Sequence, residues 1–135
     1  MKIYNLENEW SILQNQFDSY EKHSLLIKLT SIGLLSAAYF LSSMSFFVFF
    51  LLLVLWIQDA IWKTFQSRIE SRLIVVENYI ISGVNEGACQ FNSEYQQQRP
   101  GGVALIKEYL RQAIRPTIAF PHIVLLLMVG VELLF

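Results

Sequence analysis

Basic residues are missing from two long stretches of this sequence. All 10 Lys and Arg residues fall within positions 1–28 and 63–115, so positions 29–62 and 116–135 contain none. Both stretches are apolar, and the whole chain is 54% hydrophobic with a mean hydropathy of +0.42. That composition is too apolar for an ordinary water-soluble domain. We therefore expect a membrane protein whose surroundings are largely the lipid bilayer.

Residues that serve metal binding, disulfide formation and nucleic-acid binding are also scarce. Cys89 is the only cysteine and there are 2 histidines, which excludes an intrachain disulfide and leaves too few ligands for a metal site. The net charge of −1 gives no basic surface for nucleic acid. We find no glycine-rich phosphate loop and no nucleophile–histidine–acid pattern. The sequence therefore predicts no catalytic residue, metal, cofactor or nucleic-acid partner, and the protein is not expected to be an enzyme.

Three apolar stretches are predicted to cross the membrane as helices. The first two, at about 29–45 and 46–62, are separated only by a short serine-rich segment, so we expect them to be antiparallel neighbours. The third, 116–135, begins with a proline, which suits the first turn of a helix. Basic residues remain on the cytoplasmic side during insertion. The pattern therefore predicts a multi-pass inner-membrane protein with a cytoplasmic N-terminus and a periplasmic or external C-terminus.

The segments that flank the first two spans have the spacing of a coiled coil. Apolar residues recur every three or four positions along 4–28 and again along 63–83, as in a helical seam. The predicted fold class is therefore all-α, with three transmembrane helices. The first two helices form a long antiparallel hairpin over 1–83. Its segments 4–28 and 63–83 are predicted to extend into the cytoplasm as a coiled coil, and this part is called the arm. The seam residues offered as an interaction surface are Trp10, Leu13, Phe17, Tyr20, Ile69, Leu73 and Val76.

A turn near positions 44–45 fixes which seam residues should meet. Gly83 is expected to end the second helix of the arm with a left-handed cap. The charged side chains of the second half of the arm are expected to lie off the apolar face, namely Arg68, Glu70, Arg72 and Glu77. Antiparallel pairing about the turn then places Tyr20 against Ile69, Phe17 against Leu73, Leu13 against Val76, and Trp10 against Tyr79 or Ile80.

The segment between the arm and the third span divides into two parts. Residues 84–102 are polar and end in Pro-Gly-Gly, so they are predicted to form an irregular cytoplasmic loop in which Phe91 and Tyr95 offer contacts to a partner. Residues 103–115 are predicted to form a short amphipathic helix. This helix could lie on the inner membrane surface or pack on the hairpin. The surface position is favoured because the helix leads directly into the third span.

Several ionisable residues lie in or beside the predicted spans. Lys28 and Asp59 are predicted to form an interhelical ion pair, because an unpaired charge in the membrane is costly. Lys63 is a second possible partner for Asp59. Alternatively, Asp59, His122 and Glu132 handle ions or protons. Only hydroxyl groups lie between them at mid-membrane, so one copy of the chain is not expected to form a continuous path.

These observations favour a structural role over catalysis. The leading hypothesis is a non-enzymatic accessory, assembly or scaffold subunit. It would dock onto a larger membrane complex, or onto copies of itself, through the cytoplasmic hairpin. The alternative is a homo-oligomeric pore or membrane effector that conducts ions or protons through a path formed by several copies. A membrane enzyme is the weakest hypothesis, because the sequence offers no paired polar groups around a cleft.

Overall fold

The computed structural model describes residues 2–84 and 87–135 of the chain. Within these residues the protein is all-helical and contains no strand. The helices α1, α2 and α5 are long and apolar enough to cross a membrane, which confirms the prediction of three helices of this kind. The helices of the described residues are α1 (Lys2–Phe40), α2 (Phe46–Ile81), α3 (Phe91–Gln98), α4 (Gly102–Ala113) and α5 (Pro116–Leu134).

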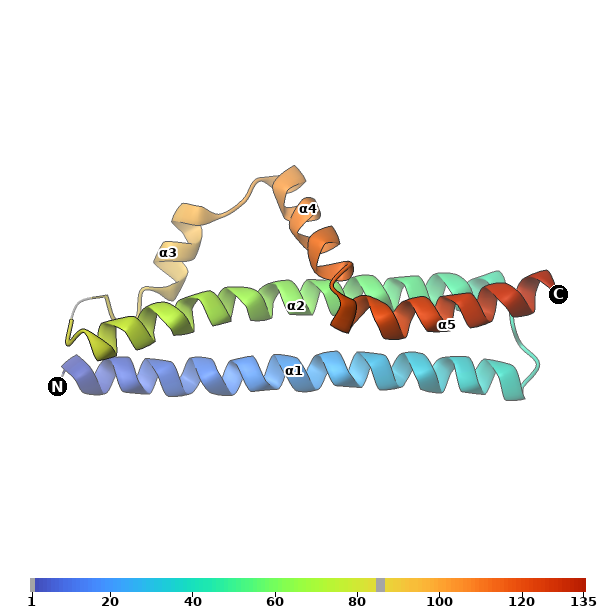
Figure 1. Ribbon diagram of the computed structural model, residues 1–135, viewed down its shortest axis with the longest axis horizontal. Helices are drawn as coiled ribbons and strands as arrows, with labels where there is room; N and C mark the ends of the chain where they lie inside the picture. The colour runs from blue at the N-terminus through green and yellow to red at the C-terminus, as the bar shows by residue number, and fades with distance from the viewer. Residues whose placement is uncertain (1, 85–86) are drawn as a thin grey trace.

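The helices form an elongated assembly. In Figure 1, α1 and α2 lie side by side in opposite directions along the whole length of the molecule. Helix α5 lies beside the half of this pair that is nearer the α1–α2 connection. Helix α3 stands off α2 in the half of the molecule that contains the N-terminus, and α4 leads the chain back to the start of α5 near the middle of the molecule. Helices α1, α2 and α5 therefore pack together in one half of the molecule. In the other half, α1 and α2 continue without α5.

The connection between α1 and α2 is longer than the sequence predicted. Helix α1 ends at Phe40, so the first span does not continue as helix to position 45. Ser42 adopts a left-handed backbone conformation with φ 50°, and the Ser43 amide bonds the carbonyl of Ala38 at 2.9 Å. Serine side chains compete for backbone hydrogen bonds and so disfavour the helix interior. The three serines of this segment therefore end α1 early.

The apolar core is divided into two clusters. One cluster joins all three long helices and consists of Leu35, Ala38, Val48, Leu52, Leu125 and Val129. The other joins α1 to α2 in the arm and consists of Leu6, Leu13, Ile69, Leu73 and Val76, with Trp10, Phe17, Tyr20 and Phe91 packed against it. In the arm cluster, burying a large apolar side chain instead of leaving it in water stabilises the fold by roughly 1.5–3 kcal/mol.

Cross-helix bonds in the arm connect residues that lie earlier on α2 than the predicted partners. The indole Nε1 of Trp10 donates to the Glu77 carboxylate at 2.9 Å, where Tyr79 or Ile80 was predicted to lie. The amide Nε2 of Gln66 donates to the carbonyl of Phe17 at 3.2 Å. Because α1 ends at Phe40 rather than at position 45, the turn is centred earlier in the sequence, and the register moves with it.

Helix α3 occupies part of the segment that was predicted to be an irregular loop. Phe91 packs against the arm cluster, and Glu94 and Tyr95 bond to arginines of α2. A helix of 8 residues is too short to be stable alone, so these contacts hold it. Positions 85 and 86 of the predicted loop lie outside the described residues.

Helix α4 occupies most of the predicted amphipathic segment, but it does not run alongside the hairpin. It stands off α2 at a steep angle and approaches α2 at its C-terminal end (Figure 1). There the Trp56 indole donates to the carbonyl of Ala113 at 3.1 Å.

Helix α2 ends in the glycine cap that the sequence predicts. Gly83 has φ 66°, its amide bonds the Ile80 carbonyl, and the Val84 amide bonds the Tyr79 carbonyl. These bonds form a Schellman motif. A Cβ at position 83 would meet no atom within 4 Å, so the cost of a side chain there comes from the backbone conformation alone.

We expect Gly83→Ala to lower the free energy of unfolding by about 1–2 kcal/mol, which is the cost of an L residue in the left-handed region. Denaturation of the detergent-solubilised chain measures the change. Gly33→Ala is the control, because Gly33 lies within helix α1 and also has open space around its Cβ position. Equal stability of the two variants would show that the cap does not limit the stability of α2.

Candidate functional site

A cluster of polar side chains is buried where α1, α2 and α5 meet. The carboxylate of Asp59 is completely buried and accepts a hydrogen bond from the Ser24 hydroxyl. Its other oxygen lies 3.1 Å from Nε2 of His122 and 3.7 Å from Nζ of Lys28. We call Ser24, Lys28, Asp59 and His122 the polar cluster. It brings together side chains from three helices around one carboxylate.

The helical repeat explains how these residues reach one another. Ser24 and Lys28 lie one turn apart on the same face of α1, and Lys28 Nζ also bonds the Ser24 hydroxyl at 3.3 Å. On α5, His122 belongs to the buried stripe that contains Ile118, Leu125 and Val129. That stripe faces α1 and α2, so the imidazole is carried inward with its apolar neighbours.

Trp56 of α2 closes the cluster on one side. Its ring stacks on the imidazole of His122, with the ring centroids 6.2 Å apart and the planes at 12°. The same indole donates to the last residue of α4, Ala113. Trp56 therefore joins the polar cluster to the end of α4.

The carboxylate of Asp59 is surrounded by one positive charge and by hydrogen-bond donors. The Lys28 ammonium balances the carboxylate charge, and Ser24 and His122 supply two further hydrogen bonds. When Nε2 of His122 donates to Asp59, Nδ1 is the unprotonated nitrogen, and Nδ1 is buried without a hydrogen-bond partner among the described residues. An imidazole in contact with a carboxylate can exchange a proton with it. Lys63, the other predicted partner of Asp59, pairs with Glu21 instead.

Glu132 is not part of this cluster. It is exposed near the C-terminal end of α5, where it lines a surface groove with Tyr39 and Met44. The apolar cluster of the three long helices, which contains Leu52 and Val129, lies between Glu132 and the polar cluster. The structure therefore brings together Lys28, Asp59 and His122, and it leaves Glu132 apart from them.

A second polar centre lies in the arm, around Arg72. This guanidinium is almost completely buried, with 3% of the residue exposed. It donates to Glu9 of α1 and to Glu94 of α3, both at 2.9 Å, and to the carbonyl of Gly87 at 2.6 Å. The other oxygen of Glu9 accepts the backbone amide of Cys89 at 2.7 Å. Arg72 and these partners form the arm network, which ties α1, α2 and α3 together.

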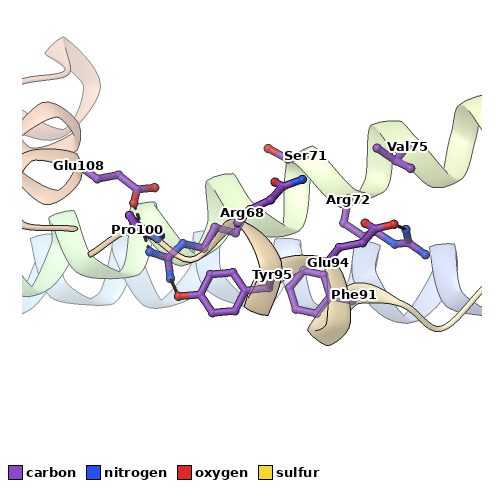
Figure 2. Close-up of a pocket in the computed structure, with 10 residues that line it drawn as sticks. Arg68, Ser71, Arg72, Val75, Phe91, Glu94, Tyr95, Pro100 and Glu108 are labelled. Atoms are coloured by element: carbon purple, nitrogen blue, oxygen red, sulfur yellow. Dashed lines mark hydrogen bonds and ion pairs between the residues drawn. The ribbon is translucent and has the colours of Figure 1, made fainter. Parts of the chain in front are cut away.

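Arg68 makes a parallel set of contacts one turn away. It donates to the hydroxyl of Tyr95 at 2.9 Å and pairs with Glu108 of α4 at 3.2 Å. Its guanidinium also lies over the Tyr95 ring, 4.8 Å from the centroid. Figure 2 shows Tyr95 and Glu108 approaching Arg68 from different elements. The two arginines therefore hold α3 and α4 against α2.

A cavity of about 330 Å³ lies between these contacts, and Arg68, Arg72, Phe91, Tyr95 and Glu108 are among the residues that line it (Figure 2). Its two guanidinium groups are already matched by three carboxylates, since Glu9 and Glu94 pair with Arg72 and Glu108 pairs with Arg68. The cavity therefore offers no free positive charge to an anionic ligand.

Arg72 was predicted to lie off the apolar face, and this prediction is wrong because the residue is only 3% exposed. Arg72 lies three residues after Ile69 and four before Val76, so helical spacing places it on the seam. Glu9 lies at the matching position between Leu6 and Leu13. The opposite charges of Glu9 and Arg72, each at a seam position of its helix, could therefore have predicted a buried ion pair.

The seam residues offered as an interaction surface contact one another within the chain. Leu13, Ile69, Leu73 and Val76 are buried, and Trp10, Phe17, Tyr20 and Phe91 are packed against the same cluster. Tyr95 bonds to Arg68. A partner that docks on the arm would therefore have to contact other, exposed side chains.

Comparison of the chain with protein-family models, with curated proteins and with solved structures gives no match.

Proposed function

We propose that this chain is a non-enzymatic docking subunit anchored in the membrane, which presents its arm to a larger membrane complex. The observation that carries the proposal is the length of the paired helices. Helix α1 has 39 residues and α2 has 36, and a helix of this length spans about 55–60 Å at ~1.5 Å per residue. The hydrocarbon core is only ~30 Å thick. About half of the helical pair therefore extends beyond the membrane as an arm.

The interior of the arm supports this role because its polar groups are already paired. The arm network and the apolar seam fix α1 against α2, so the arm is a stiff support rather than a flexible tail. On its surface, Ile74 is 53% exposed and Ile81 is 82% exposed. These two isoleucines are seven residues apart and so lie on one face of α2. They are the contact that we assign to the partner.

The distribution of basic residues supports the orientation of the proposed subunit. All of the Lys and Arg residues of α2 follow position 62, on the arm side of the apolar section. Basic residues mark the cytoplasmic side. The arm then lies in the cytoplasm of a cell whose inner membrane holds the three spans, and the C-terminus lies on the opposite side.

The test is to extract the protein in mild detergent without overexpression and to weigh its complexes by native mass spectrometry. We expect a larger partner in fixed stoichiometry, and we expect Ile74→Lys combined with Ile81→Lys to release it. Asn8→Lys combined with Asn15→Lys adds the same charges at the same spacing on the exposed surface of α1, and should retain the partner. Complexes that contain only copies of this chain would contradict the docking role.

A second candidate function, a homo-oligomeric pore or effector, is favoured by the polar cluster. Asp59 and His122 are titratable, buried and in contact, and such residues in a membrane often serve ion or proton transport. The apolar cluster between them and Glu132 blocks a polar path through one copy, so several copies would have to form it. Ion or proton flux into vesicles that is unchanged by Asp59→Asn would rule out this candidate.

A further inference from the structure

Helix α4 exposes a continuous apolar face. The four apolar residues of this face follow one another at spacings of three, four and four positions, so they lie on one side of the helix. Each is more than half exposed: Val103 at 84%, Ile106 at 59%, Leu110 at 62% and Ile114 at 71%. An exposed apolar face of this extent marks an interaction surface.

The contacts of α4 fix the direction in which this face points. On the opposite side of the helix, Glu108 pairs with Arg68 of the arm and Gln112 is 8% exposed. Figure 2 shows Glu108 extending toward Arg68 along α2. Because the polar side faces the arm, the apolar side faces away from the arm. Helix α5 lies in the half of the molecule beyond the end of α4 (Figure 1).

The position of α4 along the molecule identifies its surroundings. Helix α4 ends at Ala113, and the apolar helix α5 begins at Pro116. Trp56, which bonds the end of α4, lies near the end of the apolar section of α2, where amphipathic aromatic rings mark the membrane interface. Helix α4 is thus placed at the level where the spans leave the hydrocarbon.

The charges along α4 complement an anionic surface. Lys107 and Arg111 are exposed and lie one turn apart along one edge of the apolar face. The carboxylate of Glu108 is on the other side of the helix and is neutralised by Arg68. A basic edge beside an apolar face is the pattern of helices that lie in the interface of anionic membranes.

We propose that α4 binds the surface of the same membrane that holds the spans, with anionic phospholipid as its ligand. The apolar face lies at the boundary of the acyl chains, and Lys107 and Arg111 bind the phosphate groups of the lipids. The pair Arg68–Glu108 fixes the rotation of α4 that allows this. This lipid contact does not depend on which protein the arm binds.

The experiment uses the full chain in lipid nanodiscs, with Cys89 replaced by serine and one nitroxide label introduced at a time. A label at Ile106→Cys is expected to be accessible to oxygen, which dissolves in lipid, and shielded from a water-soluble nickel complex. A label at Ala104→Cys is the control, because Ala104 is exposed on a different side of the same helix. That label should be accessible to the nickel complex.

Lipid composition tests the charge part of the proposal. In discs that contain anionic lipid, the ratio of lipid-seated to water-exposed label at position 106 should fall about fivefold for each of Lys107→Gln and Arg111→Gln, equivalent to ~1 kcal/mol per basic residue. The two substitutions should have little effect in zwitterionic discs. Equal ratios in both lipids would overturn anionic recognition.

Three other outcomes would overturn the lipid contact itself. Access of the nickel complex at position 106 equal to that at 104 would show that the face lies in water. Shielding of position 106 from both reagents would show that a protein surface, such as a second copy of the chain, covers it. Oxygen access at both positions would show that the helix is submerged rather than lying at the surface.

Discussion

Arg72→Met is expected to lower the free energy of opening of the arm by about 3–5 kcal/mol, which is the usual cost of removing one partner from a buried ion pair. The reason is that Glu9 is only 9% exposed and would remain buried without its cation. The Gly87 carbonyl would lose its donor as well. Hydrogen exchange of backbone amides in the first half of α1, measured on the full chain in nanodiscs, reports this opening directly.

Two further variants separate the charge effect from the loss of a long side chain. Arg68→Met removes the same group one turn away, but its partner Glu108 is 32% exposed, so water can take over its solvation. We expect a loss of about 1 kcal/mol or less there. Adding Glu9→Leu to Arg72→Met should recover most of the loss, because an apolar replacement of a buried pair is often nearly neutral. Similar opening in the two arginine variants would mean that the apolar seam alone holds the arm.

Asp59→Ala is expected to destabilise the three-helix section by about 2–4 kcal/mol. The substitution removes the acceptor shared by Ser24, Lys28 and His122, and leaves donors of two neighbouring helices buried without a partner. The loss is smaller than at Arg72 because Lys28 is 18% exposed and can extend toward water. Titration of the chain with a denaturing detergent in mixed micelles measures the change in stability.

The isosteric and neighbouring variants sharpen this test. Asp59→Asn keeps an oxygen that can accept from Ser24 or Lys28, so we expect about half of the loss. Gln58→Ala changes an exposed neighbour on α2 and should be within about 0.5 kcal/mol of the parent protein. If Asp59→Ala were as stable as Gln58→Ala, the polar cluster would not be what holds α5 to the helical pair.

The long elements of this fold could be predicted because each follows from local composition. Apolar stretches of sufficient length predict the long helices, and the position of Gly83 predicts the end of α2. The end of α1 could not be placed as well, because it depends on how three serines divide their hydrogen bonds between helix and turn. The shift in the register of the arm follows from that single uncertainty about the turn.

The polar cluster was accessible to prediction only in part. Lys28 and Asp59 lie on helices joined by a short connection, so their approach could be inferred from antiparallel pairing. In the structure their charged atoms lie 3.7 Å apart. His122 lies on α5, and no sequence pattern fixes the lateral position or rotation of α5 relative to the pair. Its bond to Asp59 is therefore a product of tertiary packing.

Helix α3 also could not be predicted from its own sequence. Its sequence is polar and glutamine-rich, which indicates a loop when read alone. Its helical state depends on Glu94 and Tyr95 reaching Arg72 and Arg68. The arginines were visible in the sequence, but their partners lie on other elements.

The contacts of Arg72 also constrain how the molecule is assembled during its synthesis. Its carboxylate partners lie 63 residues before it and 22 residues after it, so the arm network can close only after Glu94 has left the ribosome. At ~5–20 residues per second, the ribosome needs about 1–4 seconds to extend the chain by the 22 residues from Arg72 to Glu94. During this time α1 and the apolar section of α2 already exist and can enter the bilayer. The first two helices can therefore enter a membrane before the arm network closes.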